Sequence, residues 1–233
     1  TGGTNISIGN YAGPTTTGGD NVCVGHAAGA ATTGSTNVAV GPYALQTNVT
    51  GNSNVAVGKQ ALQATTVGLN TAIGHQAGLY NTTGSIVAIG YQAGVSNTTG
   101  NYNTYTGYTS GYWCNGNNNS AYGYQALSAL GAAAATGGAN SAFGNAALFA
   151  NTSGAYNCAL GVQTLSGNTT GNYNTALGYQ AGFYNTTASN NTAVGYQAGY
   201  STTTGEGNVF VGGQAGYYNT TGSITAIGYQ ALY

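Results

Sequence analysis

The stretch Asn174-Thr175-Ala176-Leu177-Gly178-Tyr179-Gln180-Ala181-Gly182 is the pattern from which the whole chain is built. A glycine equivalent to Gly178 recurs in fourteen copies. The copies are 16 or 17 residues apart, except for one interval of 21 residues between Gly123 and Gly144. A period this regular predicts one structural rung per copy, with each rung stacked on its neighbours.

The residues within one copy favour short strands over helices. A rung of about 16 residues is too short for two packed helices and their turns, which need roughly 34 residues or more. Val55-Ala56-Val57 and Thr71-Ala72-Ile73 place β-branched residues at alternate positions, which is typical of strands. The glycine that follows permits a bend or a close backbone approach. The other half-rung, such as 80–85, is interpreted as a second short strand or extended edge closed by turn residues, so we expect two short strands and two tight corners per rung. The sequence therefore predicts an all-β fold, a parallel β-solenoid (a flattened β-roll) of about 14 rungs of 16–17 residues.

Stacking of equivalent residues predicts ladders of like side chains. We expect the aliphatic ladder to lie inside, an asparagine ladder bonded amide to amide at a corner, and glutamine and tyrosine ladders outside. Strands such as Val38-Ala39-Val40 are apolar on both faces, which indicates burial against the core on one side and against a partner chain on the other. The structural ladder is formed by the aliphatic residue that precedes the glycine: Val57, Ile73, Ile89, Leu160, Leu177, Val194, Val211 and Ile227.

The repeat predicts a single continuous array over residues 1–233, with one irregular segment at about 103–139. Thr106 there replaces the aliphatic residue, and 128–139 is interpreted as an inserted loop packed near Trp113. Neither end carries a polar capping repeat, so we expect either a longer array or copies stacked end to end.

The charge of the chain excludes several classes of function. Lys59, Asp20 and Glu206 are the only Lys, Arg, Asp or Glu residues in the chain, whereas about a quarter of residues are charged in ordinary proteins. Nothing in the sequence could neutralise phosphates, so nucleic acid is excluded as a partner. No apolar run reaches the roughly 18 residues that favour membrane insertion. No signal peptide is visible, and the missing initiator Met suggests a processed or excised chain. A net charge near zero promotes association, so the expected partner is the chain itself.

No catalytic, cofactor-binding or metal-binding residue is predicted, and no cofactor. His26 and His75 are not neighbours in the ladder and have no carboxylate beside them. Cys23 and Cys158 replace small residues of the repeat and are predicted to be buried, whereas Cys114 is a candidate free thiol. No CxxC pattern occurs, and the glycine-rich phrases lack the Lys-Ser/Thr of a phosphate loop. We therefore expect that the protein is not an enzyme.

Asn-x-Ser/Thr sequons recur in the half-rung that we expect to be exposed, and glycans there would keep an uncharged rod solvated. The candidate glycosylation sites are Asn81, Asn97, Asn168, Asn185 and Asn219.

Paired threonines, such as Thr82-Thr83 and Thr186-Thr187, offer an alternative function. Stacked rung on rung, they would form a hydroxyl and methyl array that resembles the ice-binding faces of β-solenoid antifreeze proteins. The simpler interpretation is a set of strand-forming threonines on a solvent face.

Two known groups of repeats resemble these phrases. Ser85-Ile86-Val87-Ala88-Ile89-Gly90 and Ser53-Asn54-Val55-Ala56-Val57-Gly58 resemble the Asn-Ser-Val-Ala-Ile-Gly repeats of trimeric autotransporter adhesin heads. The longer phrase 174–187 is similar to repeats of bacteriophage tail-fibre-like and bacterial surface proteins. The resemblance implies a left-handed parallel β-roll that trimerises side by side on a cell or virion. The period of 16–17 is longer than the adhesin repeat, and no coiled-coil stalk, membrane anchor or chaperone domain is present in this sequence.

Together these features predict a structural protein: the shaft or subunit of an extracellular fibre on a cell surface, in a secreted filament or on a virion. Its expected partners are other copies of the chain, in a side-by-side oligomer or an end-to-end filament, with glycans as a further expectation.

Overall fold

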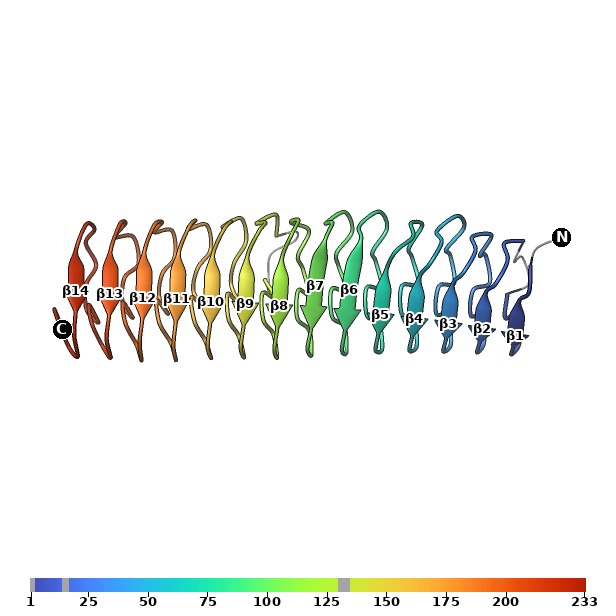
Figure 1. The fold of residues 1–233 in the computed structure, drawn as a ribbon, viewed down its shortest axis with the longest axis horizontal. Coiled ribbons are helices and arrows are strands. Elements are labelled where there is room, and N and C mark those ends of the chain that lie inside the picture. Colours follow the sequence, from blue (N-terminus) through green and yellow to red (C-terminus); the bar gives the residue numbers. More distant parts are fainter. Residues whose placement is uncertain (1–2, 14–16, 130–134) are drawn as a thin grey trace. The chain divides into compact units, whose positions relative to one another are not determined.

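The computed structural model describes residues 3–13, 17–129 and 135–233, which form two compact units, Thr1–Asn115 and Gly116–Tyr233. Each unit is a parallel β-solenoid in which the strand of one rung pairs with the strand of the next (Figure 1). The described residues contain strands and turns and no helix. Each rung holds one strand and the other half-rung forms turns, so the prediction of a second strand per rung is wrong. The all-β solenoid prediction is confirmed. The single array over 1–233 stays a prediction, and 130–134 of the predicted inserted loop lie outside the described residues.

The strands are short and begin at equivalent places in successive rungs. The first unit contains β1 (Ile6–Ile8), β2 (Val22–Val24), β3 (Val38–Val40), β4 (Val55–Val57), β5 (Thr71–Ile73), β6 (Ile86–Ile89) and β7 (Asn103–Thr106). The second unit contains β8 (Ser120–Tyr122), β9 (Ser141–Phe143), β10 (Cys158–Leu160), β11 (Thr175–Leu177), β12 (Thr192–Val194), β13 (Val209–Val211) and β14 (Thr225–Ile227).

The register joins equivalent residues within each unit. In the first unit Val57 pairs with Ile73, and Ile73 pairs with Ile89. In the second unit the same column runs through Leu160, Leu177, Val194, Val211 and Ile227. Since neighbouring parallel strands lie about 4.8 Å apart, each side chain sits directly beside its counterpart in the next rung.

The core differs from the expectation of an aliphatic ladder inside. Ala56 and Ala72, the middle residues of their strands, are fully buried, whereas Ile73 is 41% exposed and Leu177 is 44% exposed. Successive strand residues point to opposite faces, so when the alanine points inward both of its neighbours point outward. The opposite wall of the rung supplies Ala61 and other buried side chains at close range, which leaves room inside for small residues only. The interior position predicted for the aliphatic ladder is therefore wrong.

Tight corners allow so short a rung to close. Leu62 and Gln60 adopt left-handed backbone conformations, with φ of 47° and 60°. Such a conformation costs roughly 1 kcal/mol or more for a residue with a side chain. Hydrogen bonds to the neighbouring rung offset that cost, including those from Leu62 N to Ala77 O (3.0 Å) and from Gln60 N to Pro42 O (2.9 Å).

A buried asparagine ladder ties the rungs together just before each strand. The Nδ2 of Asn174 donates to Asn157 Oδ1 at 3.1 Å and to Ala188 O at 2.8 Å. Its Oδ1 accepts a hydrogen bond from the backbone N of Asn191 at 3.0 Å. The predicted amide-to-amide ladder is confirmed. In β6, Ile86 takes the place of the asparagine, and the N of Asn103 instead donates to Ser85 O at 3.4 Å.

Candidate interaction face

Two columns of outward-pointing side chains cover the strands of each unit, and together we call them the outer sheet face. The strand-start column holds the third residue before the glycine: Ile6, Val22, Val38, Val55, Thr71, Val87 and Thr104 in the first unit, and Ser120, Ser141, Cys158, Thr175, Thr192, Val209 and Thr225 in the second. The pre-glycine column holds the residue before the glycine: Ile8, Val24, Val40, Val57, Ile73, Ile89 and Thr106, and then Tyr122, Phe143, Leu160, Leu177, Val194, Val211 and Ile227.

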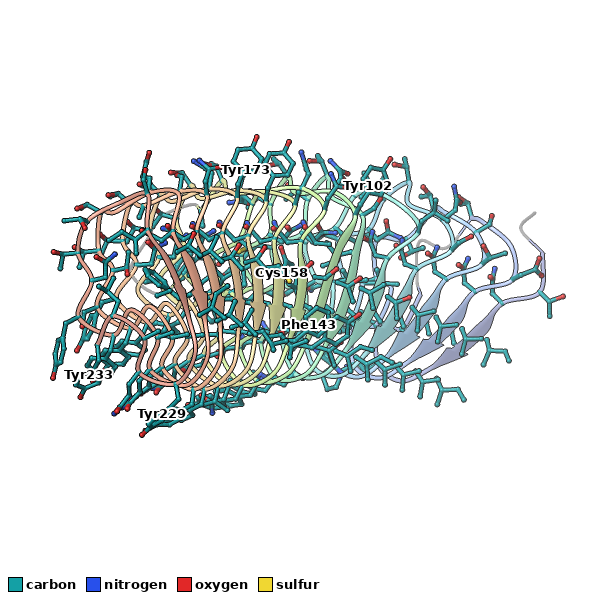
Figure 2. All side chains as sticks on the ribbon, turned by 60° about the vertical axis from the view of Figure 1, so that its left-hand side comes forward. Tyr102, Phe143, Cys158, Tyr173, Tyr229 and Tyr233 are labelled. Atoms are coloured by element: carbon teal, nitrogen blue, oxygen red, sulfur yellow. The ribbon has the colours of Figure 1, made fainter. Side chains whose placement is uncertain are left out.

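The outer sheet face is uncharged, and its pre-glycine column is apolar at every position but Thr106. In the second unit Phe143 is 38% exposed and Leu160 is 47% exposed, and equivalent side chains form rows that run from rung to rung along the stack (Figure 2). None of the three ionised side chains of the chain belongs to either column. Continuous apolar patches of this kind are uncommon on monomeric soluble proteins and mark sites of interaction.

Glutamine and aromatic ladders follow the glycine of each rung. In the second unit Gln180 Nε2 donates to Gln163 Oε1 at 2.8 Å, and Gln197 Nε2 donates to Gln180 Oε1 at 2.9 Å. Tyr179 and Tyr196 stack with ring centroids 5.7 Å apart. Because the stacked rings cover one another's faces, they present their edges outward. These ladders stiffen the stack and leave little ring face for a flat ligand.

A second aromatic ladder lies in the other half of the rung. Tyr200 and Tyr217 stack with centroids 4.8 Å apart, and Tyr184 meets Tyr200 edge to face at 5.1 Å. Desolvation, followed by the neighbouring Tyr184, raises the pKa of Tyr200 above its ordinary value. This ladder is therefore uncharged at neutral pH, like the rest of the surface around it.

Four of the five candidate glycosylation sites are buried. Asn81, Asn97, Asn168 and Asn185 are at most 2% exposed. Their Nδ2 atoms are used inside the fold, as in the bond from Asn168 Nδ2 to Asn151 Oδ1 at 2.8 Å. A sugar on Nδ2 would remove these bonds and has no space in the core, so these four side chains are not available as acceptors in the folded chain. The half-rung turns its threonines outward and its asparagine inward. Asn219 is partly exposed.

The paired threonines do not form two equivalent exposed columns. Most first threonines are buried or partly buried, and several donate to the next rung, as in the bonds from Thr82 Oγ1 to Thr98 O (2.8 Å) and from Thr186 Oγ1 to Thr203 O (3.0 Å). The Oγ1 atoms of Thr32 and Thr65 are buried without a hydrogen-bond partner. The second of each pair, such as Thr83, is exposed, so the column of second threonines is the one that faces solvent.

The accessibility of the cysteines agrees with the prediction for Cys23 and differs from it for Cys158. Cys23 is buried as expected, whereas Cys158 is exposed in the strand-start column (Figure 2). The prediction for Cys158 was wrong because the threonine that it replaces belongs to an outward column. Cys114 is buried and is not in a disulfide. Burial raises the pKa of Cys114 to about 12, and a hydrogen bond with Tyr105 opposes part of that shift.

The histidines are part of the aromatic ladders. His26 lies edge to face with Tyr43 at 5.1 Å, and His75 stacks on Tyr91 at 5.3 Å. Within the described residues, no group of three or more His, Cys, Asp or Glu side chains is placed to hold a metal ion.

The cavity of the second unit is small. It holds about 10 Å³ and is lined by residues that include Leu165, Gly182, Asn185 and Phe210. A space of that size is at the lower limit for one water molecule and is far below that of a ligand pocket.

The chain matches no known protein-family model, no curated protein and no solved structure. Over the part of the chain that the structure describes, no helix is long and apolar enough to span a membrane. Function is therefore inferred from the geometry. The outward direction of the pre-glycine column was missed in the sequence, and the alanine at most middle strand positions was the signal that could have identified it.

Proposed function

We propose that this protein is a non-enzymatic structural element, the shaft or subunit of an extracellular fibre on a cell surface, in a secreted filament or on a virion. The observation that carries the proposal is the residue-for-residue register of every strand pair described within the two units. A stack built in this way repeats the same bonds at each rung and has no part that must move.

The bonds between rungs run along the stack and surround it. Between the rungs of β11 and β12, backbone bonds join Thr175 N to Asn191 O (2.8 Å) in the strand and Gly182 N to Ala198 O (2.9 Å) in the opposite wall. The asparagine ladder adds side-chain bonds inside, and the glutamine ladder adds them outside. Each net hydrogen bond contributes about 1 kcal/mol, so a ring of them around each rung opposes bending and separation.

The near absence of charge supports assembly. With one basic and two acidic residues in 233, little electrostatic repulsion keeps copies apart. Ordinary soluble proteins have a charged surface that keeps copies apart. A chain without such a surface favours contact with other copies of itself.

Electron microscopy of the purified protein tests the proposal. Straight rods or filaments that lengthen or thicken with concentration are expected, whereas compact particles at every concentration would refute the fibre role. Immunogold labelling of the producing cells or virions tests the extracellular location, and label confined to the cell interior would exclude it. Intact mass determines whether glycans are attached.

Ice binding is a second candidate, favoured only by the exposed column of second threonines such as Thr83, Thr99 and Thr187. Thermal hysteresis of the parent protein is the measurement. If the parent is active, Thr83→Lys, Thr99→Lys and Thr187→Lys should abolish the activity, and an inactive parent removes this candidate.

A further inference from the structure

We propose that the outer sheet face of the second unit packs against the same face of a second copy of this chain. The two copies lie parallel with their rungs in register, related by a two-fold axis along the stack. This inference rests on the structural role proposed above and specifies the partner and the contact surface.

In most rungs of the second unit, the two columns of the outer sheet face compensate each other in size: a small strand-start residue accompanies a large pre-glycine residue, and a larger one accompanies a smaller one. The first unit lacks this pattern, since Ile6 and Ile8 are both large and Thr104 and Thr106 are both small. The rungs of the second unit pair Ser120 with Tyr122, Ser141 with Phe143, Cys158 with Leu160, Thr175 with Leu177, Val209 with Val211 and Thr225 with Ile227. Thr192 with Val194 is the one slightly smaller pair.

Several rungs of the buried core show the same compensation, and where both residues are small, as in Ala176 and Gly182, the side chain of Leu165 from the adjacent rung fills the space. Phe210 points inward, and the residue on the opposite wall of its rung is Gly216. In the rung of β10 the inward residue is Ala159, and the opposite-wall residue is Leu165. Close-packed interiors need such compensation because both overfilling and cavities cost stability. Side chains that only contact water have no such constraint, so compensation on the outer sheet face indicates that this face is also covered by a closely packed surface.

The compensation also selects the arrangement. Under a two-fold axis parallel to the stack, the strand-start column of one copy faces the pre-glycine column of the other in the same rung. Ser141 then faces Phe143 of the second copy, and Val209 faces Val211 of the second copy. The combined size of the two facing residues is then similar in most rungs, so the two sheets can keep one separation of about 10 Å along the unit. In an antiparallel pair, each column would face the same column of the second copy, with the rungs in reverse order. The two residues of one rung would then not face each other, and their matched sizes would have no structural role.

The repeat favours a second copy over another kind of partner. The ridges of the face recur at the strand spacing of about 4.8 Å, and another copy repeats at the same spacing over its full length. The face carries no charge by which an oppositely charged partner could be selected.

The available area is sufficient for a stable pair. Tyr122, Phe143, Leu160 and Leu177 are between 38% and 47% exposed. If a large side chain presents about 150–250 Å² when fully accessible, the half-exposed columns of the unit offer roughly 800 Å². That is what one partner contributes to a standard interface.

A double-mutant cycle on one rung tests the pairing. Ser141→Val would place valine against Phe143 of the second copy and overfill the rung, and Phe143→Val would leave a gap against Ser141. Overpacking costs about 1–3 kcal/mol, so each single variant should weaken the dimer about 10-fold or more in Kd by sedimentation equilibrium. The double variant recreates the Val209 and Val211 pair and should return to within about 3-fold of the parent.

Controls separate pairing from folding. Ser153→Val, an exposed change in the opposite half-rung, should leave Kd unchanged. Thermal unfolding of dilute monomer reports the effect of each variant on the fold, including the loss of the Tyr122–Phe143 stack (4.9 Å).

Three results would overturn the pairing. They are a parent protein that stays monomeric at all concentrations, a closed trimer, and a double variant whose loss equals the sum of the two single losses. Rods by electron microscopy together with any of these results would remove the pairing and leave the structural role intact, whereas the absence of rods would remove the structural role itself.

Discussion

The ring of Phe210 fills the space in which a side chain at Gly216 would lie. A Cβ atom on Gly216 would overlap Cδ1 and Cε1 of that ring. The backbone at this position does not itself require glycine, because Leu165 occupies the equivalent place in its rung with φ of 49°, close to the 62° of Gly216. The glycine is therefore explained by the size of its neighbour.

Gly216→Ala is expected to lower the free energy of unfolding by about 2 kcal/mol, the middle of the range for overpacking a core. The double variant Phe210→Ala with Gly216→Leu recreates the Ala159 and Leu165 arrangement and should recover most of that loss. Chemical denaturation measures both. Equal stability of Gly216→Ala and the parent, or a double variant less stable than Gly216→Ala, would contradict this account of the core.

The glycine common to all rungs has a different cause. Gly195 has φ of 134°, and a Cβ there would lie 2.5 Å from the carbonyl oxygen of Gly212 in the next rung. Neither backbone can move without breaking the ladder, so Gly195→Ala should cost about 3 kcal/mol or more, combining backbone strain and overpacking. Gly182→Ala is the matched control, because its nearest neighbour is the flexible side chain of Leu165. Circular dichroism during thermal unfolding should rank Gly195→Ala well below Gly182→Ala.

Asn174→Ala tests the asparagine ladder. The change leaves the backbone N of Asn191 buried without its partner, and the carbonyl of Ala188 keeps only the bond from Asn185 Nδ2. An unpaired buried group costs about 1–3 kcal/mol, so we expect a loss of about 2 kcal/mol in the free energy of unfolding. Asn172→Ala removes a partly buried bond to Ala155 N, which water can replace, and should cost less than about 1 kcal/mol. Similar losses in the two variants would show that the ladder contributes little.

Thiol reactivity should separate the three cysteines. Cys158 is exposed, whereas Cys23 and Cys114 are each 1% exposed. In a solution dilute enough for the monomer, where no second copy covers Cys158, a thiol reagent at pH 8 should therefore modify one cysteine in the native state and three after denaturation. The Cys158→Ser variant should show no rapid reaction in the native state, and rapid reaction at Cys114 would contradict its burial.

Alkaline pH should destabilise the fold through Cys114. Its folded pKa is about 12 against an ordinary value of 9.0, so the thiol must lose a proton on unfolding above pH 9. Its contribution to stability is complete below pH 9 and is lost as the pH rises toward 12, by up to about 1.4 kcal/mol per pH unit. Cys114→Ser, which keeps a hydroxyl near Tyr105, should reduce the drop in unfolding free energy between pH 8 and pH 10.5. An unchanged drop would assign the alkaline sensitivity to other groups.

The period and the alanine pattern were sufficient to predict the solenoid, because a 16- or 17-residue rung leaves few alternatives. The direction of the side chains was not predictable by the usual rule that aliphatic residues lie inside. In so thin a rung only alanine fits between the walls at most strand positions, and residues such as Leu177 are directed outward. The left-handed corners at Leu62 and Gln60 contradict local propensity and follow from bonds to neighbouring rungs. The burial of Asn168 depends on the same cross-rung bonding, which a sequon does not reveal.

Engineered disulfides test the stacking most directly. In a Cys158→Ser background, Leu177→Cys with Val194→Cys places the two cysteines in one strand pair, with Cα atoms about 4.8 Å apart and within the range that a disulfide spans. Leu177→Cys with Ala193→Cys places them on opposite faces of the strands, and Leu177→Cys with Val211→Cys places them two rungs apart. On mild oxidation the first pair should crosslink rapidly and nearly completely, and the other two should not. Crosslinking of either control pair in preference to the first would show that equivalent residues are not stacked rung on rung.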